Sequence, residues 1–129
     1  MSLFSSLSKE KNWEIKYALL IEAGKQMSVL PESERSPDLR VPGCNAPTWI
    51  KIDSTSNHLS LSGYSKSHVV LGLLALVREY VSTHTLKDLQ KLSPQDFAEL
   101  GLSEILTPTR QNGFVHILQT IQDYARKVR

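Results

Sequence analysis

The sequence predicts an α+β fold in which a small antiparallel β-hairpin packs against several helices. Three observations lead to this prediction: an amphipathic helical pattern over residues 13–27, two strand-like segments over residues 48–52 and 58–64, and helical patterns from residue 66 onward. Because a lone hairpin is only marginally stable in water, helices are expected to cover one of its faces. The order helix, hairpin, helices indicates one layered domain over residues 1–129.

Composition sets the broad class of protein. The chain has 129 residues, 40% of them hydrophobic, and a net charge of only +2 from 15 Lys and Arg against 13 Asp and Glu. This balance argues against a nucleic-acid binder, which usually carries a strong basic excess. Residues 1–8 lack the basic flank and long apolar run of a signal peptide, and the apolar run over residues 69–77 is too short to span a bilayer. We therefore expect a soluble, cytoplasmic protein with no membrane partner.

The first helix is expected over residues 13–27, with Asn12 as its N-cap. Trp13 and Tyr17 fall on the apolar side of this helix, so both are expected to lie in the core. Residues 28–43 contain three prolines and many charged side chains. This segment is expected to be an ordered surface loop with one helical turn, leading to Cys44.

The two strands of the predicted hairpin differ in pattern. Residues 48–52 are β-branched and aromatic, and Trp49 is expected to pack in the core. Residues 54–57 have the composition of a turn. Residues 58–64 alternate between apolar and polar side chains, as a half-buried strand does.

The remaining elements are helical. Residues 66–82 are apolar almost all round, Val69 included, which is typical of a buried helix at the centre of a core. A short helix is expected over residues 85–92 and another over residues 93–101, ending at Gly101. The last helix begins at Thr107-Pro108. Its apolar face contains Phe114, Ile117, Leu118, Ile121 and Ala125, and its C-terminal end carries Arg126, Lys127 and Arg129.

The most informative single residue is Cys44, the only cysteine. A single cysteine excludes an internal disulfide, a cysteine-rich zinc site and a cluster held by several thiolates. Cys44 follows Pro42-Gly43, a turn dipeptide, and precedes Asn45, so it lies at the tip of a proline-bounded loop. A thiol presented in this way can accept a sulfur atom from a partner's persulfide by thiol exchange.

Positive charge near Cys44 would favour its thiolate. Arg40 lies close by in the chain, and Arg110 lies in the first turn of the last helix. The four histidines are scattered and form no metal-ligand spacing, so no metal site is expected, and surface or capping positions are expected for them. They are His58, His68, His84 and His116.

The motif around Cys44 resembles the active-site segment of the SufE family of sulfur acceptors. It consists of RVPGC at residues 40–44, followed by Trp49-Ile50. Further segments resemble the same family in order along nearly the whole chain: WEIKY at 13–17, IEAG at 21–24, SP at 36–37, LTPTR at 106–110, and Gly113. The sequence departs from the family at residues 45–48, where NAPT replaces the common QSQV, and at Lys66, where an acidic residue is frequent.

The resemblance implies a SufE/IscU-like fold and a role in sulfur transfer. Cys44 would take sulfane sulfur as a persulfide from a pyridoxal-phosphate-dependent cysteine desulfurase of the SufS or CsdA type, stimulate that enzyme, and pass sulfur on to a SufBCD-like iron–sulfur scaffold complex. The chain itself would bind no cofactor, because the pyridoxal phosphate belongs to the partner. Arg110 matches an arginine that the family places near the acceptor, and is expected to stabilise the thiolate or persulfide.

The candidates for contact with the desulfurase are Arg40, Pro42, Gly43, Asn45 and Lys66. Three other functions remain as alternatives. An independent thiol enzyme needs an activating base, and no Cys–His signature is present. An iron–sulfur scaffold needs several ligands, whereas this chain has one thiol. A non-transferring adaptor would dock on the desulfurase without using Cys44.

Overall fold

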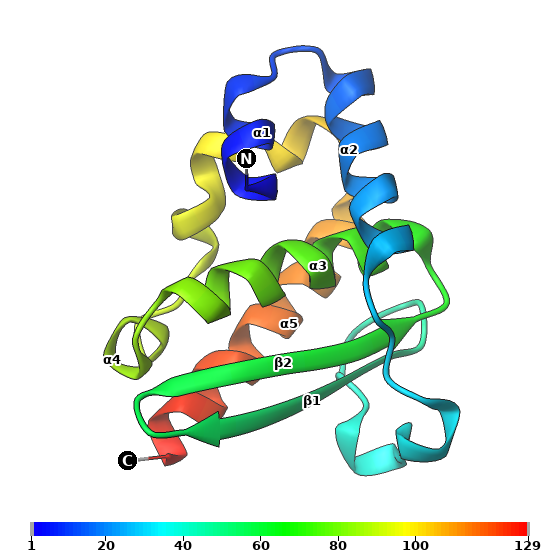
Figure 1. The fold of residues 1–129 in the computed structure, drawn as a ribbon. Helices are drawn as coiled ribbons and strands as arrows, with labels where there is room; N and C mark the ends of the chain where they lie inside the picture. The colour runs from blue at the N-terminus through cyan, green and yellow to red at the C-terminus, as the bar shows by residue number, and fades with distance from the viewer. Residues whose placement is uncertain (1, 129) are drawn as a thin grey trace.

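A computed structural model of the chain describes residues 2–128, so the expectation for Arg129 lies outside it. Its elements follow the predicted order of helix, hairpin and helices (Figure 1). They are α1 (Leu3–Lys9), α2 (Trp13–Gln26), η1 (Glu32–Glu34), η2 (Pro37–Leu39), β1 (Thr48–Thr55), β2 (His58–Ser65), α3 (His68–Thr83), α4 (Leu86–Leu89), η3 (Pro94–Leu100), η4 (Leu102–Glu104) and α5 (Pro108–Lys127). The α+β prediction is confirmed.

The hairpin is longer than its sequence pattern indicates. β1 and β2 pair antiparallel from Thr48 opposite Ser65 to Thr55 opposite His58. The predicted turn over residues 54–57 is therefore wrong at its start, because Ser54 and Thr55 belong to β1. The chain reverses at Ser56-Asn57, where Ser56 has a φ of 55°. A two-residue reversal of this kind matches the right-handed twist of the flanking strands.

The core lies between the hairpin and the helices, with α3 at its centre. α3 crosses the inner face of the hairpin, and α5 runs behind it (Figure 1). Ile50, Leu59 and Leu61 supply the buried face of the hairpin. The predicted apolar face of α5 is buried as expected. α3 buries seven residues, although Val69 is only partly buried.

Helices α2 and α3 contact each other backbone to backbone. A Cβ atom added to Gly24 would lie 2.7 Å from the amide nitrogen of Gly72, and one added to Gly72 would lie 2.8 Å from the carbonyl carbon of Leu20. Such a close approach is open only to residues without a side chain. This contact fixes α2 across the N-terminal half of α3.

The prediction that Trp13 and Tyr17 lie in the core is wrong. Trp13 is 55% exposed and Tyr17 is 38% exposed. The buried residue on this part of α2 is instead Lys16, whose Nζ donates a hydrogen bond to the carbonyl oxygen of Leu100 at 2.5 Å. That carbonyl ends η3, where a cation is favoured electrostatically. The bond turns α2 so that its aromatic side chains face outward.

Trp49 is likewise outside the core, contrary to expectation. It lies on the face of β1 opposite Ile50, stacks on Tyr64 with ring centroids 6.2 Å apart, and is only partly buried. The 28–40 loop covers this outer face with arginines: the guanidinium carbon of Arg35 lies 3.6 Å from the centre of the Tyr64 ring, and that of Arg40 lies 5.9 Å from the Trp49 ring. Cation–π contact therefore replaces core packing for these two aromatic side chains.

Other boundaries differ from the sequence-based expectation. α1 was not predicted; the Glu79 carboxylate of α3 accepts the Leu3 and Phe4 amides at 2.8 and 3.0 Å and so caps its first turn. α3 begins at His68, because Ser67 caps it, rather than at residue 66. The cap predicted at Asn12 is confirmed, and α5 begins as predicted at Thr107-Pro108, with Thr107 as its cap.

The two short helices before α5 are also less regular than predicted. Within residues 85–92, only Leu86–Leu89 is α-helical. The segment from Pro94 to Leu100 is a 3-10 helix, which ends as predicted at Gly101 in the left-handed conformation. The 28–43 loop contains two helical turns, η1 and η2, where one was expected.

The contact between α2 and α3 predicts a strong effect of Gly72→Ala. Alanine raises helix propensity by only about 1 kcal/mol, whereas overpacking a core costs about 1–3 kcal/mol. Here the added methyl meets a backbone that cannot move aside, so we expect a net loss of about 2 kcal/mol in the free energy of unfolding, measured by urea denaturation. Ser82→Ala, at an exposed position of α3, serves as the control and should stay within about 0.5 kcal/mol of the unsubstituted protein. An unchanged stability of Gly72→Ala would contradict the close contact.

Candidate functional site

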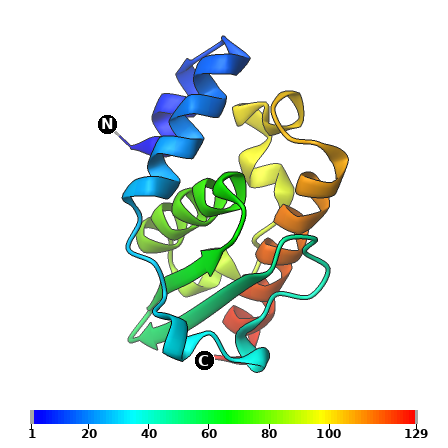
Figure 2. The same cartoon turned by 90° about the vertical axis from the view of Figure 1, so that its right-hand side faces the viewer.

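The site is built on the loop over residues 40–47, which leads into β1 and lies beside α5 (Figure 2). Both ends of the loop are tied to the hairpin. The Val41 amide donates a hydrogen bond to the Thr48 carbonyl at 2.9 Å, and the Lys66 amide donates to the Pro47 carbonyl at 3.2 Å. The intervening residues 42–46 are therefore held at their base and project toward α5.

Cys44 sits at the apex of this loop, partly buried against α5. Its Sγ atom donates a hydrogen bond to the carbonyl oxygen of Gly113 at 3.6 Å. A Cβ atom at position 113 would lie 3.5 Å from the same sulfur, in ordinary van der Waals contact. The thiol thus lies directly against the backbone of α5.

Gly43 allows the bend that brings Cys44 to α5. Its φ is +77°, a conformation that residues with a side chain rarely adopt. The His116 ring of α5 lies where a side chain of residue 43 would point, since an added Cβ atom would be 2.7 Å from its Cε1. Two neighbouring residues of the loop therefore contact two positions one helical turn apart on α5.

The environment of Cys44 favours the protonated thiol. Burial raises the pKa of Cys44 above its ordinary value, and this is the largest influence. The polar side chain of Thr48 and the positive charges of Arg110 and Arg40 lower the pKa, but they only partly offset burial. Since the ordinary pKa of a thiol is about 8.5, Cys44 is protonated in this conformation at neutral pH.

The candidate residues named from the sequence differ in how they relate to Cys44. Arg110 and Arg40 are the cations close enough to affect its charge, as the sequence suggested. Pro42, Gly43 and Asn45 are exposed around the thiol. Arg40 and Lys66 are also exposed, and Lys66 adjoins the base of the loop through its amide. The structure thus places Arg110 and Arg40 near the thiol, and Lys66 at the base of its loop.

Two residues of the site were missed from the sequence. His116 lies at the surface as expected, but it was not assigned to the site, and its ring contacts the 40–47 loop at Gly43. Thr48 was noted only as a strand residue and as part of a departure from the family, yet it is fully buried, its hydroxyl lies 3.0 Å from that of Ser65, and its side chain lowers the pKa of Cys44. The one sequence signal that could have found His116 is its spacing of three residues from Gly113. This spacing puts both residues on the same side of α5.

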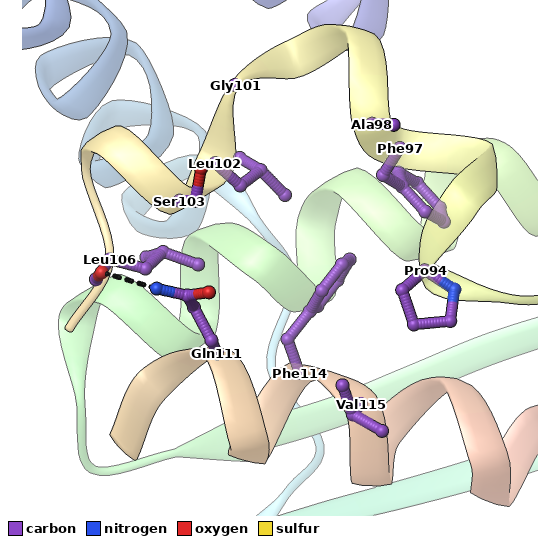
Figure 3. A pocket seen from close by; sticks show the side chains of 10 residues that line it. All are labelled: Pro94, Phe97, Ala98, Gly101, Leu102, Ser103, Leu106, Gln111, Phe114 and Val115. Carbon is purple, nitrogen blue, oxygen red and sulfur yellow. Dashed lines mark hydrogen bonds between the residues drawn. The ribbon is translucent and has the colours of Figure 1, made fainter. Parts of the chain in front are cut away.

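A separate pocket of about 270 Å³ lies between the η3–η4 segment and α5. Phe97, Leu102 and Phe114 give it an apolar lining, and the amide of Gln111 is held by a 3.0 Å hydrogen bond to the Leu106 carbonyl (Figure 3). Its lining does not include Cys44.

Among residues 2–128, no group of three or more His, Cys, Asp or Glu side chains is placed to hold a metal ion. None of the helices in this part of the chain has the length and apolarity needed to cross a membrane.

The architecture defines an α+β protein that presents one thiol on a loop between its first helices and its hairpin. A similar fold is found in the solution structure of a hypothetical protein from Thermus thermophilus, with a TM-score of 0.79. The match covers 96% of this chain and 90% of that chain at 21% identity, so it shows the fold alone. The sequence model of SufE, the Fe-S metabolism associated domain, matches residues 1–125. The chain therefore belongs to the SufE family and is associated with Fe–S metabolism.

The position of Arg110 predicts how its removal changes the thiol. In Arg110→Gln the positive charge that favours the thiolate is lost, so the pKa of Cys44 should rise further. We expect alkylation by iodoacetamide at neutral pH to slow about two- to fivefold, while the rate at high pH stays unchanged. Lys127→Gln, an exposed charge change at the other end of α5, is the matched control. A pKa that does not move in Arg110→Gln would show that this cation does not act on the thiol.

Proposed function

We propose that this protein is a sulfur acceptor and carrier, which takes sulfane sulfur from a cysteine desulfurase as a persulfide on Cys44 and delivers it toward iron–sulfur cluster assembly. The single observation that carries this proposal is the placement of the only cysteine at the apex of a loop with exposed neighbours, in a member of the SufE family. A carrier of one sulfur atom needs one thiol that a partner can reach, and this chain has one.

The transfer step is a thiol exchange. The Cys44 thiolate attacks the outer sulfur of the donor's persulfide, a new S–S bond forms on Cys44, and the donor's S–S bond breaks. The donor cysteine leaves as a thiolate, and the proton of Cys44 passes to solvent or to that thiolate. No oxidant or reductant is consumed, because the sulfane sulfur keeps its oxidation state throughout.

The resting geometry supports a carrier that reacts when a partner displaces the loop. With Sγ against the Gly113 carbonyl, Cys44 is protonated and half covered, which keeps it a weak nucleophile. Moving residues 42–46 away from α5 would remove the burial that raises the pKa of Cys44. Arg40, at the start of the same loop, would then favour the thiolate and the persulfide anion.

The partner in this proposal is a cysteine desulfurase of the SufS or CsdA type, which supplies the pyridoxal phosphate. Pro42, Gly43 and Asn45 are exposed beside the thiol, and Arg40 and Lys66 add exposed positive charge on either side of the loop. These five residues form the proposed contact surface. Stimulation of the desulfurase, delivery to a SufBCD-like scaffold and a cytoplasmic location stay predictions.

The decisive experiment is the intact mass of this protein after incubation with a desulfurase of the SufS type, cysteine and pyridoxal phosphate. The proposal predicts one added sulfur atom on Cys44, removed by dithiothreitol and absent in Cys44→Ser. The desulfurase's own persulfide is measured in the same sample as a positive control. No added sulfur on the unsubstituted protein beside a loaded desulfurase would overturn the proposal.

The same variant separates the carrier from an adaptor that only docks. A carrier needs the thiol, so Cys44→Ser should abolish any stimulation of sulfide release from cysteine by the desulfurase. If Cys44→Ser stimulates as well as the unsubstituted protein, the protein acts as an adaptor and the transfer step is wrong.

A further inference from the structure

The side of α5 that faces the acceptor loop carries three residues at a spacing of three: Arg110, Gly113 and His116. The positive charge of Arg110 affects Cys44, the Gly113 carbonyl accepts its S–H, and the His116 ring lies against Gly43. The apex of the loop therefore contacts α5 at two neighbouring positions, Gly113 and His116. The contact with Gly113 is one long hydrogen bond to sulfur, which is weak. The contact with His116 is made by the Nε2–Cε1–Cδ2 edge of its ring, which occupies the position that a Cβ atom of residue 43 would take, although His116 is otherwise exposed.

We propose that His116 is a positioning residue for the acceptor loop, which holds the bend at Gly43 and thereby sets how far Cys44 is exposed to a sulfur donor. The role of this contact in sulfur transfer rests on the proposed function. The restraint of the loop by the His116 ring is a property of the isolated protein. The loop is tied at its base by the bonds from Val41 to Thr48 and from Lys66 to Pro47. The ring therefore acts on the short free part, residues 42–46.

The physical argument is one of filled space. Gly43 has no side chain and a positive φ, so the bend itself supplies no contact with α5. The imidazole ring fills the space that a side chain would otherwise take, and it blocks the bend from collapsing toward α5 or rotating. Without the ring, Cys44 is kept on α5 only by its own partial burial and the weak sulfur hydrogen bond. Local opening of residues 42–46 then becomes easier, because fewer contacts oppose it.

Opening changes the chemistry of the thiol in a defined direction. Burial is the main cause of the raised pKa of Cys44, and it is reduced when the loop leaves α5. The other groups that act on Cys44 are the Thr48 side chain and the charges of Arg110 and Arg40, all of which lower the pKa. A looser loop therefore gives a more accessible thiol with a lower pKa. His116 acts on reactivity through the loop, without touching the transferred sulfur.

The test measures alkylation of Cys44 by iodoacetamide, a neutral reagent, as a function of pH in the isolated protein. His116→Ala should lower the apparent pKa of Cys44 and raise the rate at neutral pH by about threefold or more. His116→Phe keeps a planar ring in the same place and should restore the behaviour of the unsubstituted protein. Val115→Ala, a neighbouring α5 side chain that is 43% exposed, is the matched control and should have no effect.

A double-mutant cycle with Gly43→Ala tests the contact itself. In the unsubstituted protein the new methyl meets both the His116 ring and the unfavourable positive φ. In His116→Ala only the backbone strain remains. Gly43→Ala should therefore lower the urea midpoint less in the His116→Ala protein than in the unsubstituted one.

Two outcomes would overturn the inference. If His116→Ala lowers the melting temperature but leaves the pH profile of Cys44 unchanged, the ring has only a general structural role. If the effects of Gly43→Ala and His116→Ala are additive, the two residues do not contact each other. Neither result depends on a desulfurase, so both are distinguishable from a failure of Cys44 to accept sulfur.

Discussion

The site depends on the contact between the 40–47 loop and α5. This contact brings together segments about 70 residues apart in the chain, and it decides the state of the thiol. On α5, Cys44 is covered, hydrogen-bonded to the Gly113 carbonyl and protonated. Away from α5, the same residue would be an accessible thiol on the loop that also carries Arg40. The core around α3 supports this arrangement, because α3 packs against both the hairpin that anchors the loop and the helix that receives it.

The fold was largely predictable because its strongest signals are local. The alternation over residues 58–64, the apolar residues of α3 and the cap at Thr107 each follow from neighbouring residues. The errors have a different origin. Trp13 and Tyr17 share an apolar stripe with Leu20, but the bond from Lys16 to the Leu100 carbonyl, which joins residues far apart in the chain, turns that stripe partly outward. A helical periodicity cannot show which part of an apolar face a partner element covers.

The candidate site was predictable to the extent that it lies in one stretch of chain. Cys44 and its loop neighbours form a continuous motif, and Arg110 was found through the resemblance to the family. His116 and Thr48 were not assigned to the site, because their importance comes from proximity in space: one packs on a glycine that follows a turn, and the other contributes a buried hydroxyl at the start of β1. A histidine on an exposed helix face and a threonine in a strand are both common, so neither residue type signals a functional site.

The cover that α5 gives to Cys44 has a consequence for chemical damage. Peroxides oxidise the thiolate rather than the thiol, and the higher oxidation products of cysteine are irreversible. A cysteine that rests protonated against the Gly113 carbonyl offers such oxidants little anion to attack. Since the chain has no second cysteine to form a rescuing disulfide, this cover is the protection that the fold provides for its single thiol.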